Sequence, residues 1–128
     1  MPNPIEYATY IIDLTDAMME HRKGLNAEQF HRIGLINHRA VQFITLFMQK
    51  ESVSAPALLQ YLTEDAQEPL RSIRGNCKKM MSGEYGEFEP DYAEAIQEIY
   101  DCVYEMVGDV QQLCRDLKQF MAAIGIED

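Results

Sequence analysis

The sequence predicts an all-α protein built of four helices, and three observations support this fold class. No segment shows the strict alternation of apolar and polar residues that is typical of strands. Four segments repeat apolar residues at helical spacing, and short stretches containing Gly, Ser or Pro separate them. The last segment keeps a three-four spacing over nine apolar residues, here termed the apolar seam: Ile96, Ile99, Val103, Met106, Val110, Leu113, Leu117, Phe120 and Ile124. Because such a 3.5-residue repeat is typical of helices that pack lengthwise, we expect a helical bundle.

Local signals mark the ends of the first two helices. The first helix is expected over roughly residues 3–23, ending near Gly24. Asn26, with Gln29 three residues later, forms a capping-box pattern that starts the second helix. Together these helices make an N-terminal pair, residues 1–52.

The third and fourth helices have similar signals at their ends. Ser54 and Pro56 start the third helix, and Ser82–Gly83 ends it. Glu89–Pro90 offers a cap and a first-turn proline for the fourth helix, which is the longest. Because only about five residues connect the two helices, we expect them to form an antiparallel hairpin over residues 54–125.

Charge is concentrated at the C-terminal end of the sequence. The net charge is −10, and residues 84–128 account for all of it, with twelve acids against Arg115 and Lys118. We expect a basic stripe on the third helix (Arg71, Arg74, Lys78) to face an acidic stripe on the fourth (Glu94, Glu98, Asp101, Glu105). An acidic surface repels phosphate groups, so the composition favours protein partners over nucleic acid or membrane.

Length and composition indicate one domain, residues 1–128, with 47% hydrophobic residues. The cysteines Cys77, Cys102 and Cys114 have no metal-type spacing, so we interpret them as core thiols in a reducing compartment. The N-terminal stretch lacks a basic leader and contains acidic residues, so we expect neither a signal peptide nor a membrane span. A cytoplasmic location follows as an expectation.

Pro69 lies inside the predicted third helix, where a proline typically costs about 3 kcal/mol. The surrounding residues 62–76 resemble the first helix of the dimerisation and histidine-phosphotransfer domain of sensor histidine kinases. Further elements follow in the order and spacing of that family: Pro69-Leu70, Ile73, Gly75, a turn at residues 82–86 and the apolar seam. The resemblance covers roughly residues 58–121.

The resemblance implies a dimerising hairpin without catalytic residues. In the family the phospho-accepting histidine lies five residues before the proline, and this chain has Glu64 there, followed by Asp65. The glycine-rich boxes of an ATP-binding domain are absent from the sequence. We therefore expect a non-catalytic signal-transduction protein that regulates or docks a sensor kinase or a response-regulator receiver domain.

The same resemblance implies how the chain assembles. We expect a homodimer that packs two hairpins through the apolar seam, with the first two helices outside the bundle or extending it. A receiver domain would dock at Glu64 and Asp65, with Arg71 and Arg74 one to two turns further along the helix.

Two alternatives stay open. A histidine phosphotransferase could use His31 or His38, which share a face of the second helix, and His21 begins a weak match to a phosphotransfer pattern. The second alternative is a monomeric four-helix bundle that serves only as a scaffold. Glu28 and His31 have the i, i+3 spacing of di-iron bundles, but only one copy is present, so we predict no metal and no cofactor.

Overall fold

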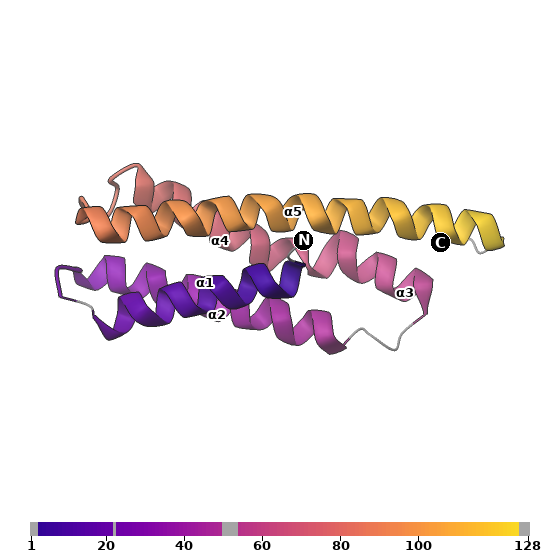
Figure 1. The fold of residues 1–128 in the computed structure, drawn as a ribbon, viewed down its shortest axis with the longest axis horizontal. Coiled ribbons are helices and arrows are strands. Elements are labelled where there is room, and N and C mark those ends of the chain that lie inside the picture. The colour runs from indigo at the N-terminus through magenta and orange to yellow at the C-terminus, as the bar shows by residue number, and fades with distance from the viewer. Residues whose placement is uncertain (1–2, 22, 50–53, 126–128) are drawn as a thin grey trace.

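The computed structural model describes residues 3–21, 23–49 and 54–125. Its elements are α1 (Pro4–Glu20), α2 (Ala27–Gln49), α3 (Ala55–Gln60), the π-helical turn η1 (Tyr61–Asp65), α4 (Gln67–Met81) and α5 (Pro90–Ile124). These described ranges contain no strand. Because α3, η1 and α4 follow one another almost without interruption, they form one rod, and the described residues form four rods (Figure 1). The predicted all-α, four-helix fold class with a long C-terminal helix is confirmed.

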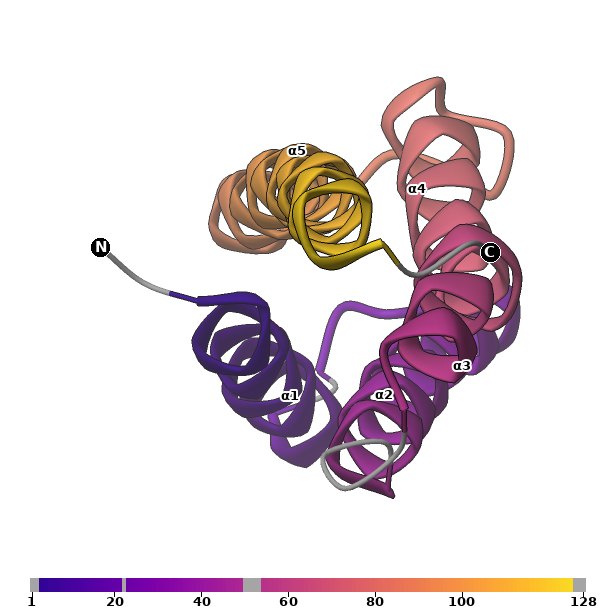
Figure 2. The ribbon, with the colours of Figure 1, turned by 90° about the vertical axis from the view of Figure 1, so that its right-hand side faces the viewer.

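The four rods form a bundle in which consecutive rods run in opposite directions (Figure 1). α1 packs against α2 and α5, and α4 packs against the same two helices, while α3 and η1 contact α5. Seen end-on, the rods surround a common centre (Figure 2). The α4–α5 hairpin is antiparallel, as predicted. The expectation that the first two helices lie outside the bundle is wrong, because α1 and α2 complete it within the chain.

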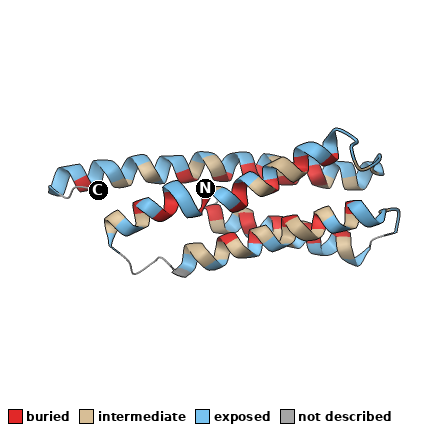
Figure 3. Cartoon of the chain, turned by 180° about the vertical axis from the view of Figure 1, so that it is seen from behind, coloured by how far each residue is buried: buried red, intermediate tan, exposed pale blue. Residues whose placement is uncertain are grey.

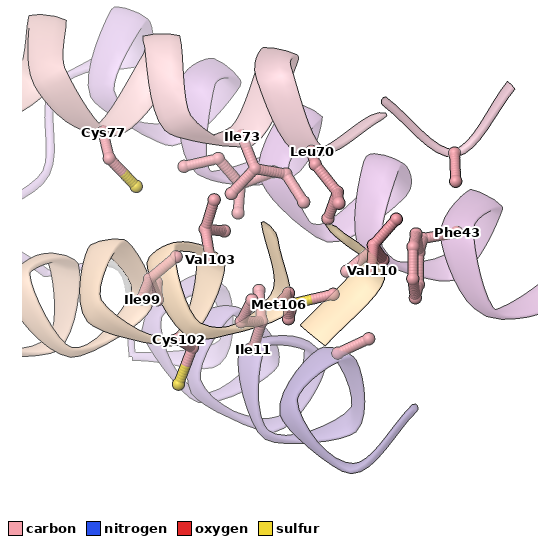
Figure 4. Packing of buried hydrophobic residues seen from close by; sticks show 14 of the residues in the cluster. Ile11, Phe43, Leu70, Ile73, Cys77, Ile99, Cys102, Val103, Met106 and Val110 are labelled. Carbon is pink, nitrogen blue, oxygen red and sulfur yellow. The ribbon is translucent and has the colours of Figure 1, made fainter. Parts of the chain in front are cut away.

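One apolar core runs through the bundle and joins all four rods (Figure 4). It includes Ile11 of α1, Phe43 of α2, Leu70, Ile73 and Cys77 of α4, and Ile99, Val103, Met106 and Val110 of α5. Burial of each large side chain of this kind contributes about 1.5–3 kcal/mol relative to exposure. The α1–α2 pair therefore covers the side of the α4–α5 hairpin that we expected a second subunit to cover.

The apolar seam is divided into a buried part and an exposed part. Its first five residues, Ile96 to Val110, are at most 1% exposed, whereas Leu113, Phe120 and Ile124 are 38%, 54% and 52% exposed. The difference arises because α1 has 17 residues and α5 has 35, so α5 extends well past the first residue of α1 (Figure 3). Homodimerisation stays a prediction. In the closed bundle only the last part of the apolar seam is exposed, so only this part could contact a second subunit.

Pro69 does not occupy the helix interior expected from the sequence. It is the third residue of α4 and is buried, and the π-helical turn η1 lies directly before α4. In this turn the Ala66 amide donates to the Tyr61 carbonyl oxygen, five residues back, at 3.0 Å. Since the amide of a third helical residue has no partner within its own helix, the missing N–H of Pro69 costs little there.

Two predicted helix starts are confirmed and one is corrected. The capping box of Asn26 and Gln29 is present, and the Ala57 amide donates to Ser54 Oγ at 3.4 Å. Glu89 occupies the N-cap position of α5 but its side chain makes no capping hydrogen bond. Its carboxylate lies instead beside Gly24, where an added Cβ would come within 2.6 Å of it.

Candidate protein-docking surface

The residues that the resemblance marks as a docking site lie on the solvent side of the third rod. Glu64 and Asp65 are exposed in η1, and Arg71 and Arg74 are exposed on α4. Pro69, between them, is buried and faces the core. The four charged residues that the resemblance singles out are therefore all accessible to solvent on one rod.

One of these four residues, Arg74, lines a groove between α4 and α5. This hairpin groove has a volume of about 240 Å³ and is lined by Arg74, Tyr100, Tyr104, Val107, Gly108 and Gln111. Tyr104 is 69% exposed, and a Cβ added to Gly108 would meet no atom within 4 Å, so the groove is open at this point. Aromatic side chains and arginine are the residue types enriched where proteins bind one another.

We did not expect this groove from the sequence. A signal was present, because Tyr100, Tyr104 and Gly108 recur at steps of four residues. Residues at this spacing share one helix face, beside the apolar seam. Two aromatic residues followed by a glycine on such a face indicate a recess bordered by rings.

The acidic stripe of α5 faces α1 and not α4, contrary to the prediction. The Tyr10 hydroxyl of α1 donates to Glu98 Oε2 at 3.1 Å. Burial, followed by the negative charges of Glu105 and Asp109, raises the pKa of Tyr7, also on α1. Among the described residues the single ion pair is Arg32 with Glu28, 2.8 Å apart within α2. Arg71 and Arg74 are thus left without a carboxylate partner in the described part of the chain, which keeps their charge available.

A second groove, the end groove, lies at the end of the bundle where the C-terminus of α5 is found. It has a volume of about 390 Å³, and its apolar walls are Phe47 of α2, Leu58 of α3, Leu62 of η1, and Leu113, Leu117 and Phe120 of α5. Asp116 is its one charged lining residue among those described. The exposed part of the apolar seam therefore forms one wall of this groove.

The three cysteines have the properties expected of core thiols. Burial raises the pKa of Cys77 to about 12, and burial together with nearby carboxylates raises that of Cys102 to about 11. Burial also raises the pKa of Cys114, which is half-buried. Since the thiolate is the reactive form, these side chains are weak nucleophiles near neutral pH.

The histidines do not converge on a site. His31 and His38 are exposed on α2, and His21 is exposed just after α1. Arg22, the next residue of the weak phosphotransfer pattern, lies outside the described residues. No group of three or more metal-ligating side chains is close enough to hold an ion among the residues that the structure describes.

No helix in the described ranges has both the length and the apolar character needed to cross a bilayer. Comparison with known proteins found no matching family model, no matching curated protein and no matching solved structure. The functional assignment therefore rests on the sequence resemblance and on the geometry of the two grooves.

Proposed function

We propose that the protein is a non-catalytic docking protein of two-component signalling, and that it binds a receiver domain over the outer face of the α4–α5 hairpin. The observation that supports this most directly is the hairpin groove, which includes Arg74, one of the residues expected to dock a receiver. In the histidine-kinase family that residues 58–121 resemble, receiver domains dock beside the phospho-accepting position. Glu64 occupies that position here and is exposed.

The groove offers suitable chemistry for a protein contact. Tyr100 and Tyr104 supply large apolar surfaces, and the recess beside Gly108 can accept an apolar side chain of the partner. Arg71 and Arg74 add positive charge to a protein whose net charge is −10. Such isolated positive charges favour acidic groups on the partner and set its orientation more than its affinity.

A carboxylate at Glu64 cannot form the phosphohistidine on which the family's reaction depends. Docking would then hold a receiver without passing it a phosphoryl group, and the protein would compete with a catalytic kinase for the same receiver surface. A sensor kinase, bound through its own hairpin, is the other partner of this class that the resemblance implies.

The test is direct binding to purified receiver domains from the source organism, measured by biolayer interferometry. Arg74→Glu and Tyr104→Ala should each weaken binding by about tenfold or more, as expected for residues at an interface centre. Lys79→Glu is the matched control, because Lys79 is exposed on α4 but does not line the groove. If no receiver binds, or if Arg74→Glu, Arg71→Glu and Glu64→Ala all bind as the wild type does, the proposal is wrong.

The exposure of His31 and His38 favours one alternative, a histidine phosphotransferase. Incubation with phosphorylated receivers discriminates between the two functions. Acid-labile phosphate on the wild type that is lost in His31→Ala or His38→Ala would establish phosphotransfer. Binding of a receiver without labelling would support the docking function.

A further inference from the structure

The end groove exists because one of the four rods is too short. α1 begins at Pro4 beside the middle of α5, whereas α2, α3 and α5 continue past that point (Figures 1 and 3). Where α1 is present, it covers the inward faces of α2 and α5. Beyond its first residue the same faces, with Phe47 and Leu117 among them, line the end groove. The groove therefore continues the surface on which α1 packs.

The shape and lining of the groove suit a helix. Leu113, Leu117 and Phe120 present an apolar face at three-four spacing, and Phe47, Leu58 and Leu62 form the opposite wall. A helix placed along the line of α1 would meet both walls with its own residues at i, i+3 or i+4, and i+7. The exposed part of the apolar seam is long enough for about three to four turns of such a helix.

The charge around the groove indicates the chemistry of that helix. Asp116 lines the groove. It continues the acidic edge of α5 formed by Glu98, Glu105 and Asp109, which face α1. The α1 side chains that face this acidic edge, Tyr7 and Tyr10, carry no charge. Asp116 Oδ1 accepts a hydrogen bond from Gln112 Nε2 at 2.8 Å, and Arg115 donates to Gln112 Oε1 instead of pairing with Asp116. Because no cation of the described residues lies within 4 Å of the Asp116 carboxylate, a basic residue beside the apolar face of a helix in the groove would be favoured.

We propose that the end groove binds an amphipathic helix of another protein, with basic residues flanking its apolar face. A second copy of this chain is a poorer occupant. Its exposed seam would bring a second Asp116 to the same groove, and two chains of net charge −10 would approach each other. This site lies at the end of the bundle and is independent of the hairpin groove.

Two synthetic 18-residue helical peptides provide the probe. Both carry leucines at i, i+3, i+4 and i+7, and they differ only in having lysine or glutamate beside the apolar face. The lysine peptide should bind the full-length protein about tenfold or more tightly than the glutamate peptide, measured by fluorescence anisotropy. Phe120→Glu should abolish this binding, because it places a charge in the apolar wall.

Matched variants separate the groove from general charge effects. Gln119→Glu introduces the same residue next to Phe120 on the exposed side of α5 and should bind as the wild type does. Asp116→Lys should remove the preference for the lysine peptide, whereas Asp101→Lys, an equal charge change at an exposed position outside the groove, should keep it.

Three results would overturn the proposal: no binding of the lysine peptide, equal binding of both peptides, or equal loss of binding in Phe120→Glu and Gln119→Glu. Sedimentation equilibrium of the protein alone gives a fourth. A species of twice 14.7 kDa that Phe120→Glu converts to monomer would show that a second copy occupies the groove.

Discussion

Asn26 and Gln29 hold each other in a reciprocal pair of hydrogen bonds. The Gln29 amide donates to Asn26 Oδ1 at 2.8 Å, and the Asn26 amide donates to Gln29 Oε1 at 2.9 Å. Their side-chain nitrogens also donate across the bundle, to the carbonyl oxygens of Tyr85 at 2.8 Å and Glu87 at 3.2 Å. The start of α2 and the loop between α4 and α5 are thereby fixed to each other. A helix cap thus also joins the two hairpins at this end of the bundle.

Replacing Asn26 should destabilise the protein by more than the loss of an ordinary cap. Asn26→Ala removes the cap and leaves the Tyr85 carbonyl without its donor, so we expect a loss of about 1–2 kcal/mol in the free energy of unfolding. Ser54→Ala, which removes an exposed and longer capping bond, should cost less. Urea unfolding measures both, and an Asn26→Ala loss no larger than that of Ser54→Ala would contradict the linking role.

Gly86 should be intolerant of substitution for two independent reasons. Its φ is +99°, and an added Cβ would lie 3.2 Å from Asn26 Nδ2. Gly86→Ala should therefore lower the free energy of unfolding by about 1 kcal/mol or more, through backbone strain and displacement of Asn26. Gly75→Ala on α4 is the control, since a Cβ there meets no atom within 4 Å and alanine favours helix. Equal effects of the two changes in urea unfolding would refute this explanation.

Pro69→Ala should change stability by no more than about 1 kcal/mol. Relief of a proline inside a regular helix would stabilise the protein by about 3 kcal/mol. Here the π-helical turn already accommodates the missing N–H, and alanine would fill less of a buried position. Equilibrium unfolding decides the matter, and a gain near 3 kcal/mol would mean that Pro69 strains the rod.

Alkaline pH should destabilise the bundle. Folding raises the pKa of Cys77 and Tyr61 to about 12 and that of Cys102 to about 11, mainly through burial. The folded state holds these protons more tightly than the unfolded state. The contribution of these three groups to the stability of the fold is therefore complete below about pH 9 and is lost as the pH rises towards 12. Urea unfolding between pH 8 and about pH 11 should show this decline. Cys77→Ala should decline less steeply, and a slope equal to that of the wild type would exclude the thiol as a cause.

Much of the fold could be predicted because it depends on local patterns. The apolar seam identified the longest helix, and the capping residues Asn26 and Ser54 marked two helix starts correctly. The π-helical turn could not be predicted, because it depends on how α3 and α4 are held together against α5. Glu89 shows the same limit, since the residue type permits a cap, but in the structure its carboxylate lies beside Gly24, where a larger residue would leave no room for it.

The candidate site could be predicted only in part, for a physical reason. Arg71 and Arg74 were recognisable as exposed charges, but the side of α5 that faces each neighbour depends on the packing of α1. Two carboxylate-bearing positions, Glu98 and Glu105, were assigned to α4 on spacing alone, and the structure turns them to α1. The end groove follows from the unequal lengths of α1 and α5, which the sequence indicates, but only if α1 is known to pack inside the bundle.

The central claim is that one chain closes its own four-helix bundle, with Ile11 of α1 and Met106 of α5 in a shared core. An isotope-filtered nuclear Overhauser experiment on an equal mixture of labelled and unlabelled chains tests this most directly. We expect methyl contacts between Ile11 and Met106 within labelled chains and none between labelled and unlabelled chains. Contacts between the two kinds of chain for this pair would show instead that the bundle is assembled by two subunits.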